Sequence, residues 1–489
     1  MIVGVIGNRR LGWLFGAAAL AVAAGCSTLP DRRPEAGALP EAWADAPVGA
    51  QDPDAMAAWW RGFNDPTLDL LVEEALAEGP DLRLAALRVR ESRALSRTTL
   101  TQYLPQLTAA GQVNYSQALD GPDLRTSTQA LSGAGGDSEQ AIGGYGPQIS
   151  WEIPLFARIE AAAVGARATV RGAEADLRGA RVALIADVAQ AYIDLRAAQN
   201  TRAAVAEAVA LSDQLAAVVA QGAAAGFSSP AEAADARRLA ETNRAQLPGL
   251  VIEARRAENV LAVLRGRAPG TEPDAIAQAL SAGGETPALD LAAAPAAPAD
   301  LLRLRPDVAR AEADAIIAAA DLGLARADLL PQLSLTGGIS VTDNILGAAL
   351  TERSASLDLT PAITMPLFDW GSRLAAVRVR DSRFEQALIS YRGTVNQAVA
   401  DASNALIALE QGRLRLQAAR AAEEAALATA EGARAAYQAG VQSLADRIRA
   451  EQQLIDARTS RIDAEAAQAS AAVRVYRAFG GGSVATQAP

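Results

Sequence analysis

The 489-residue sequence contains no histidine and no lysine, and its only cysteine is Cys26. The missing histidine removes the commonest general base and the commonest metal ligand of proteins. A lone cysteine excludes disulfides, structural zinc sites and CxxC redox motifs within one chain. No motif typical of a catalytic nucleophile is present either, so we expect no enzyme activity, no metal and no cofactor. The formal net charge of -11 argues against nucleic acid as a partner.

Aromatic residues are also scarce, at 4%, although half of the sequence is hydrophobic. Alanine supplies much of the apolar fraction. Because alanine is the best helix former and adds little volume to a core, this composition predicts long, closely packed helices.

The first residues have the features of a secretory signal. Arg9 and Arg10 precede an apolar run, residues 11–24, which is too short to span a bilayer comfortably. Small residues then lead to Cys26 in a pattern that resembles a bacterial lipobox, with Ala23 where leucine is usual. We therefore expect residues 1–25 to be removed and Cys26 to carry lipid. The alternative is an ordinary signal peptide with a chance cysteine. Without the two arginines the net charge is -13 (43 basic against 56 acidic residues).

No later run of eighteen apolar residues follows, so we expect no transmembrane helix. If the mature chain crosses a membrane, it must do so as strands of a closed barrel. Ser27 follows the cysteine in place of the aspartate that often marks retention in the inner membrane. For a lipoprotein, this favours the outer membrane.

Four short sequence motifs recur in the same order along the chain, which indicates an internal duplication. Their offsets are 226, 226, 212 and 214 residues (80 to 306, 105 to 331, 154 to 366 and 226 to 440). The motifs, each given as its first copy and then its second, are Gly79-Pro80-Asp81-Leu82 and Arg305-Pro306-Asp307-Val308; Leu104-Pro105-Gln106-Leu107 and Leu330-Pro331-Gln332-Leu333; Pro154-Leu155-Phe156 and Pro366-Leu367-Phe368; and Ala225-Gly226 and Ala439-Gly440. We expect a lipidated extended segment at 26–66, repeats at 67–267 and 305–482, a linker at 268–304 and a tail at 483–489.

The sequences of the two repeats predict the same order of helices and strands. A helix (67–103; 306–329) ends at a proline, and two segments with period-two alternation follow. A helix of roughly 65 residues, about 100 Å long, then runs to a glycine, and a shorter helix (230–264; 444–479) returns. Gly165, Gly172 and Gly179 fall seven residues apart, a spacing that could let two helices approach closely.

Four strands of about ten residues suit an outer membrane, but they cannot close a barrel alone. Three copies would supply twelve strands around a water-filled lumen, and the helices would continue as an antiparallel α-helical barrel. The fold class expected is thus a mixed α/β membrane protein, and the alternative is a soluble sandwich. Alternation predicts these residues on the lumen side: Gln148, Ser150, Glu152, Asp358 and Thr360. The helix–barrel junctions are expected at Pro105, Pro331, Pro154 and Pro366.

The chain resembles the TolC-type outer-membrane efflux proteins, in particular the lipoprotein, NodT-like branch paired with resistance-nodulation-division transporters. The resemblance rests on residues 59–66 (WWRGFNDP), both Leu-Pro-Gln-Leu motifs, residues 301–308 (LLRLRPDV), residues 366–371 (PLFDWG) and residues 479–482 (FGGG). It implies a homotrimer with a twelve-stranded barrel and a long periplasmic α-barrel. It also implies a periplasmic adaptor, an inner-membrane pump and outer-membrane lipid as partners.

In this family, acidic residues after the second helix turn form a constriction, so we expect a periplasmic gate near Gly226 and Gly440. Asp446 lies where one such aspartate is expected, but Arg449 stands where another acidic residue is common. The two side chains could therefore pair, or both could be solvated surface charges.

The sequence thus favours a passive exit duct for small molecules, without catalytic residues. An outlet for protein secretion and a structural coiled-coil envelope lipoprotein are the alternatives.

Overall fold

The computed structural model describes residues 28–32, 34–35, 58–117, 139–271, 274–288, 305–344 and 354–481. Cys26, the expected signal peptide and the expected tail at 483–489 lie outside this part. The chain forms two compact units, and both repeats contribute to each. The first unit takes residues up to Pro34, Ser92–Val170 and Asp314–Leu388, and the second takes Glu35–Glu91, Arg171–Ala313 and the residues from Ile389 onward.

Two pairs of helices reproduce the duplication residue by residue. α4 (Pro80–Thr101) and α9 (Pro306–Ala327) each have 22 residues, and both of their ends differ by 226. α5 (Arg158–Ala224) and α10 (Ser372–Gln438) each have 67 residues, with both ends 214 apart. Elements of identical length at a constant offset are what a duplicated unit produces.

The helix expected at 230–264 is in fact two helices, so that prediction was wrong. α6 (Pro230–Arg244) ends before α7 (Leu247–Leu264) begins, whereas the matching α11 (Leu444–Ala478) is continuous over 35 residues. The cause is Pro248, which occupies the first turn of α7. Proline is tolerated there because it needs no hydrogen-bonded N–H, but inside a helix it would break the ladder.

Two segments expected to be irregular contain short helices. η1 (Trp59–Phe63) lies in the segment expected to be extended. The helix expected at 67–103 is in fact divided at Gly79 into α3 (Pro66–Glu78) and α4, so that prediction was also wrong. α8 (Asp274–Ser281) lies in the expected linker, with Ile276 and Leu280 buried. Arg196 donates hydrogen bonds to the last carbonyls of α8, at 3.1 Å to Ala279 and 3.2 Å to Leu280. Capping of these carbonyls stabilises a helix that its eight residues could not sustain alone.

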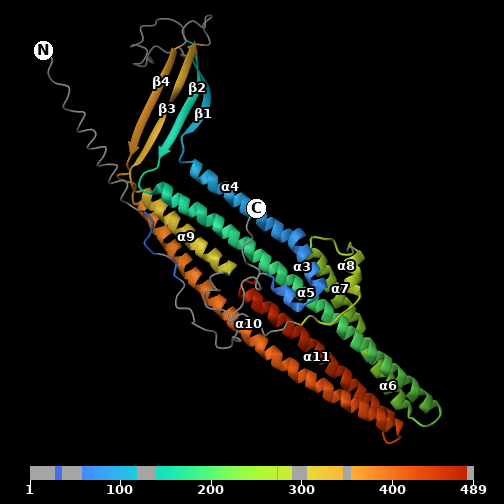
Figure 1. Cartoon of the computed structure of the whole chain (residues 1–489). Helices are drawn as coiled ribbons and strands as arrows, with labels where there is room; N and C mark the ends of the chain where they lie inside the picture. Colours follow the sequence, from blue (N-terminus) through green and yellow to red (C-terminus); the bar gives the residue numbers. More distant parts are fainter. Residues whose placement is uncertain are drawn as a thin grey trace, which may run out of the picture. The chain divides into compact units, whose positions relative to one another are not determined.

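The first unit contains one antiparallel sheet in the order β1-β2-β3-β4 (Figure 1). The strands are β1 (Gln106–Gln117), β2 (Glu139–Ile153), β3 (Gln332–Asn344) and β4 (Ser354–Thr364). Each repeat therefore supplies one hairpin, and β2 and β3 join the two hairpins. All four alternating segments of the sequence form strands, as predicted.

Helices within each unit pack closely through glycines of α5. A Cβ atom on Gly165 would lie 3.1 Å from Ala320 of α9, in the first unit. In the second unit, Cβ atoms on Gly172 and Gly179 would lie 3.1 Å from Arg310 and 3.4 Å from Pro306. The seven-residue glycine spacing thus serves contact with α9.

The core of the second unit explains the sequence around the paired tryptophans. Trp59 stacks on Tyr476 of α11, with ring centroids 4.8 Å apart. Asp65 caps α3 and accepts a 2.8 Å hydrogen bond from the Tyr192 hydroxyl through its other carboxylate oxygen. Burial raises the pKa of Tyr192 to about 12, although the hydrogen bond from Arg196 opposes this rise. These contacts fix the segment before α3 to α5 and α11.

Helix α5 contains an 18-residue stretch with a mean hydropathy of 1.5, which is long and apolar enough to span a membrane by composition alone. No such helix was expected. The same helix continues for 67 residues and carries Glu207, which forms a 2.5 Å ion pair with Arg458 of α11. Alanine and valine account for much of the apolar character of α5.

Candidate functional site

The two faces of the sheet differ completely in chemistry. Side chains alternate between faces along a strand, and paired residues of neighbouring strands share a face. Leu107 is paired with Ile149, Ile149 with Gly337, and Gly337 with Leu359. The odd-numbered residues of all four strands therefore lie on the same face of the sheet. That face carries apolar or small side chains, among them Leu107, Val113, Tyr115, Tyr145, Ile149, Trp151, Leu333, Leu335, Ile339, Leu357, Leu359 and Ile363.

The even-numbered face is mostly polar, and it holds all five residues expected to face a lumen. Gln148 is paired with Thr108 and Gly338, and Gly338 is paired with Asp358. The same register parity places Ser150, Glu152 and Thr360 on this face. All five side chains are exposed.

The apolar face has no covering layer among the described residues. Leu107, Leu357 and Ile363 are 74%, 68% and 75% exposed. A contiguous row of large apolar side chains in water is unfavourable and marks a surface made for lipid or for another protein. A soluble sandwich would need a second layer over this face, and the described part of the chain provides none.

The outer edges of β1 and β4 have no partner strand within the described part of the chain. Unpaired backbone groups at such edges would be costly in lipid. Glycine permits close strand pairing inside the sheet, since a Cβ atom on Gly146 would overlap the carbonyl oxygen of Ile339. The sheet is therefore a segment with two edges open for pairing.

The four prolines expected at junctions lie between helices and strands. Pro105 and Pro331 precede β1 and β3, and Pro154 and Pro366 follow β2 and β4. Two consecutive left-handed residues stand immediately before each following helix, Phe156 and Ala157 before α5 and Trp370 and Gly371 before α10. Both helices are thus entered through the same pair of left-handed residues, although the connection after β4 is longer.

Charged side chains fasten these connections in the first unit. Arg158, at the start of α5, forms a 2.9 Å ion pair with Asp328, just beyond α9. Arg373 of α10 donates a 2.6 Å hydrogen bond to the Asp328 carbonyl oxygen. Trp151 donates a 2.9 Å hydrogen bond to the carbonyl oxygen of Tyr103, between α4 and β1.

The two glycines expected at the helix turns adopt left-handed conformations, with φ of 77° at Gly226 and 72° at Gly440. Each turn is closed by a backbone hydrogen bond to a carbonyl of the preceding helix, from Phe227 to Gly222 at 2.8 Å and from Val441 to Ala436 at 3.0 Å. Glycine suits this C-terminal position because it has no Cβ penalty at positive φ. A serine then caps the next helix in both copies.

Asp446 and Arg449 form an ion pair of 2.9 Å on the exposed first turn of α11. Asp446 also accepts a 2.7 Å hydrogen bond from the Ser443 hydroxyl. That hydrogen bond, together with the Arg449 guanidinium, lowers the pKa of Asp446, so the carboxylate is ionised at neutral pH. Because both side chains are exposed, the pair contributes little stability and is free to exchange partners.

Sequence reasoning missed a buried carboxylate close to this turn. Glu451 of α11 is 1% exposed and accepts hydrogen bonds from Arg447 at 2.8 Å and from Arg434 of α10 at 3.0 Å. Burial alone would raise its pKa, but the two guanidinium groups outweigh burial and lower it. The only available signal was the i, i+4 spacing of Arg447 and Glu451, which is common on exposed helix faces.

Near Cys26, the described chain resumes at Thr28, which is buried in the first unit. The Thr28 carbonyl accepts a 3.4 Å hydrogen bond from Arg326 of α9, and Arg32 pairs with Glu385 of α10 at 2.9 Å. Cys26 itself lies outside the described residues.

Within the described part of the chain, no three acidic, histidine or cysteine residues are grouped as a metal site would require.

Comparisons with known proteins give a consistent result. The chain matches the family model described as outer membrane efflux protein over residues 71–267 and 297–481. It is 29% identical to outer membrane protein OprJ of Pseudomonas aeruginosa over 477 residues, which cover 96% of each chain. It is 26% identical to the probable outer membrane lipoprotein SilC of Salmonella typhimurium, over 87% of this chain and 88% of SilC. The solved outer-membrane channel OprN superimposes with a TM-score of 0.80 at 29% identity, over 93% of this chain and 99% of that chain.

Proposed function

We propose, since the chain belongs to the outer membrane efflux protein family, that it forms the exit duct of a tripartite efflux pump. It is an outer-membrane protein with a large periplasmic part. Three copies would each contribute four strands to a twelve-stranded barrel, and their helices would continue it as a hollow α-barrel. In this assembly the duct carries small molecules from the periplasm to the outside.

The observation that carries this proposal is the sheet with one apolar face, one polar face and two open edges. Pairing β4 of one copy with β1 of the next satisfies the edges without adding any strand. The apolar face then meets lipid. The face with Gln148, Glu152 and Asp358 lines the water-filled lumen. A solitary coiled-coil lipoprotein would have no use for such a sheet.

The duct needs partners because it has no energy source of its own. A passive channel supplies an enclosed aqueous path, and transport against a gradient requires an active pump. A periplasmic adaptor and an inner-membrane transporter of the resistance-nodulation-division class would complete the assembly. This part of the proposal rests on family membership.

Lipid attachment at Cys26 would anchor each copy. Each buried methylene contributes about 0.8 kcal/mol, so several acyl chains give a stable anchor. The contacts of Thr28 and Arg32 with α9 and α10 would hold the anchor close to the junction between helices and strands.

Replacing this cysteine tests the anchor directly. Cys26→Ser should abolish incorporation of labelled palmitate in growing cells, because serine has no thiol for the thioether bond. Ser27→Ala, a matched change at the next residue, should retain the label. Label remaining on the Cys26→Ser protein would refute attachment at this position.

The gate is proposed at the turn after α10, where Asp446 would help to constrict the lumen. Asp446→Ala should raise the single-channel conductance of the isolated trimer in a planar bilayer, because it removes a charged group that narrows the path. Glu232 occupies the equivalent capping position of α6, 214 residues earlier, and accepts a 2.7 Å hydrogen bond from the Ser229 N–H.

Glu232→Ala is therefore the control for the loss of helix capping alone, and it should leave the conductance unchanged. Equal conductance of Asp446→Ala and the unsubstituted protein would remove Asp446 from the gate. Equal increases in both variants would assign the effect to helix capping.

A further inference from the structure

The buried carboxylate of Glu451 bridges two arginines that lie on different sides of the α10–α11 turn. Its Oε1 atom accepts a 2.8 Å hydrogen bond from Arg447 of α11 and a 3.0 Å hydrogen bond from Arg434 of α10. The Arg447 guanidinium also lies over the ring of Tyr437, near the end of α10, 5.5 Å from the ring centroid. Arg434, Arg447 and Glu451, the turn triad, therefore join the two helices next to the turn at Gly440.

The turn triad carries a cost that a stabilising contact does not need. Glu451 is 1% exposed, so its charge has lost most of its contact with water. Its second oxygen, Oε2, is buried and accepts no hydrogen bond from any residue that the structure describes. Desolvation of a charge is expensive, and a buried ion pair is often no more stable than an apolar contact of similar volume. The triad is therefore better explained by the helix arrangement that it fixes than by the stability that it adds.

The equivalent turn of the first repeat forms without such a triad. At the offset of 214, the three triad positions are Ala220, Ala233 and Arg237 (220 to 434, 233 to 447, 237 to 451). The two turns nevertheless share a left-handed glycine, a closing backbone hydrogen bond and a serine cap. A turn of this kind thus needs no triad, so the turn triad has a task that the α5–α6 turn does not share.

A second triad of the same kind lies two heptads further from the turn. Glu465 of α11 accepts a 2.5 Å hydrogen bond from Arg461 and a 3.2 Å hydrogen bond from Arg420 of α10. Each member lies fourteen residues from its counterpart in the turn triad (420 to 434, 447 to 461, 451 to 465). The Glu465 side chain is 21% exposed, against 2% for Glu451. This distal triad joins the same two helices by the same residue types, but far from the turn.

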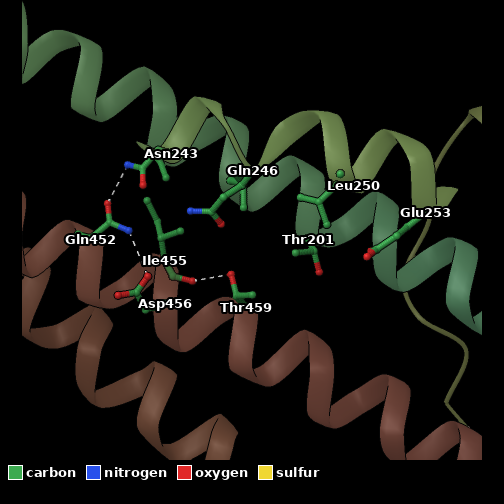
Figure 2. A pocket seen from close by; sticks show the side chains of 12 residues that line it. Thr201, Asn243, Gln246, Leu250, Glu253, Gln452, Ile455, Asp456 and Thr459 are labelled. Atoms are coloured by element: carbon green, nitrogen blue, oxygen red, sulfur yellow. Dashed lines mark hydrogen bonds between the residues drawn. The ribbon is translucent and has the colours of Figure 1, made fainter. Parts of the chain in front are cut away.

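A further contact anchors α11 at the residue after Glu451. Asn243 of α6, which is 4% exposed, donates a 3.3 Å hydrogen bond to the side-chain oxygen of Gln452. Figure 2 shows this hydrogen bond between the two helices. At Glu451 and Gln452 the helix is therefore tied to both α10 and α6. Asp446 lies five residues earlier (446 to 451), and Arg447 connects its turn to this anchored part.

We propose that Glu451 is a positioning residue for the gate, which fixes the first turn of α11, and with it Asp446, against α10. Arg447 directly follows Asp446, so its bridge to Glu451 holds the turn that presents the Asp446 carboxylate. Without the carboxylate, the guanidinium groups of Arg447 and Arg434 repel each other and this turn separates from α10. The inference rests on the proposed gate, whereas the contacts themselves lie within each single chain.

Hydrogen exchange of the full-length, detergent-purified protein tests the positioning independently of transport. Glu451→Gln keeps the shape of the side chain and removes its charge. The backbone amides of residues 446–450 should exchange about tenfold faster or more in this variant, because hydrogen bonds to a charged group are lost. Glu465→Gln, the matched control, removes the same charge from the distal triad and should leave these amides unchanged. Equal exchange in Glu451→Gln and the unsubstituted protein would overturn the inference.

The single-channel conductance of the isolated trimer in a planar bilayer then tests the connection to the gate. Glu451→Gln should conduct more than the unsubstituted protein, and Glu465→Gln should conduct the same. Because Glu451 acts through Asp446, the double variant Asp446→Ala/Glu451→Gln should conduct no more than Asp446→Ala alone. Equal increases in Glu451→Gln and Glu465→Gln, or an additive increase in the double variant, would overturn the positioning role.

The two measurements also separate this inference from the proposed duct. Faster exchange in Glu451→Gln, with no conductance from any variant or from the unsubstituted protein, would refute the duct and with it the gate. The hold of Glu451 on the first turn of α11 would stand in that case. Normal conductance of the unsubstituted protein with unchanged exchange in Glu451→Gln would leave the duct in place and refute the role of Glu451.

Discussion

Leu359→Arg should prevent formation of the assembled protein, whereas Thr360→Arg, at the next residue, should be tolerated. The two positions are neighbours near the middle of β4, but their side chains lie on opposite faces of the sheet. Arginine on a lipid-facing strand costs about 2–4 kcal/mol near the bilayer midplane. In the proposed three-copy assembly every copy would carry the substitution, so the penalty would be roughly threefold larger.

Heat-sensitive migration on gels, measured on outer-membrane fractions, would report this difference. The unsubstituted protein and Thr360→Arg should both run as an assembly that heating dissociates. Thr360→Arg should also shift the ion selectivity of the channel towards anions, because its charge would lie in the proposed lumen. If Leu359→Arg assembled normally while Thr360→Arg did not, the faces would be assigned the wrong way round.

Arg305→Met should destabilise the second unit by about 2–3 kcal/mol, because it removes the hydrogen-bond partner of a buried carbonyl group and of two partly exposed carboxylates. The guanidinium of Arg305 donates to the Ala478 carbonyl of α11 at 2.8 Å and pairs with Asp307 at 2.7 Å and Asp401 at 3.2 Å. It therefore ties the start of α9 to α10 and to the end of α11. Both aspartates are partly exposed, which keeps the expected cost below that of a fully buried pair.

Thermal unfolding followed by circular dichroism should show the Arg305→Met midpoint lowered by roughly 5 °C. Arg413→Met is the control, because Arg413 forms an exposed pair with Glu410 three residues away in the same helix. Such pairs contribute little, so this variant should unfold like the unsubstituted protein. Equal midpoints for the two variants would show that the buried cluster does not hold these helices together.

The sequence pattern alone was sufficient to predict the strands and helices that occur in both repeats. Alternation along β3 and β4 predicted the two faces, because a strand has a period of two whatever lies next to it. Pro105 and Pro331 predicted where helices stop, since proline cannot continue a helix. The offsets of 212 and 214 at the two ends of the long helices then predicted closely matching lengths for α5 and α10.

Features that depend on one tertiary contact were not predictable in this way. The helix α8 is held by Arg196, which lies about 80 residues earlier in the chain. Glu451 is buried only because Arg434 approaches it from another helix, and its counterpart 214 residues earlier is Arg237. The break before α7 did have a signal in Pro248, but a helical pattern on both sides concealed it.

Disulfide cross-linking between the sheet edges tests the central claim, that separate copies join β4 to β1. Gln112→Cys in β1 would be combined in turn with Ser356→Cys, Asp358→Cys and Thr360→Cys in β4, all on the polar face. Within one chain two strands separate β1 from β4, so these positions are about 14 Å apart, too far for a disulfide. At least one pair should give dimers and trimers and nothing larger on non-reducing gels. Monomers alone from all three pairs, or a ladder extending beyond trimers, would contradict a three-copy barrel.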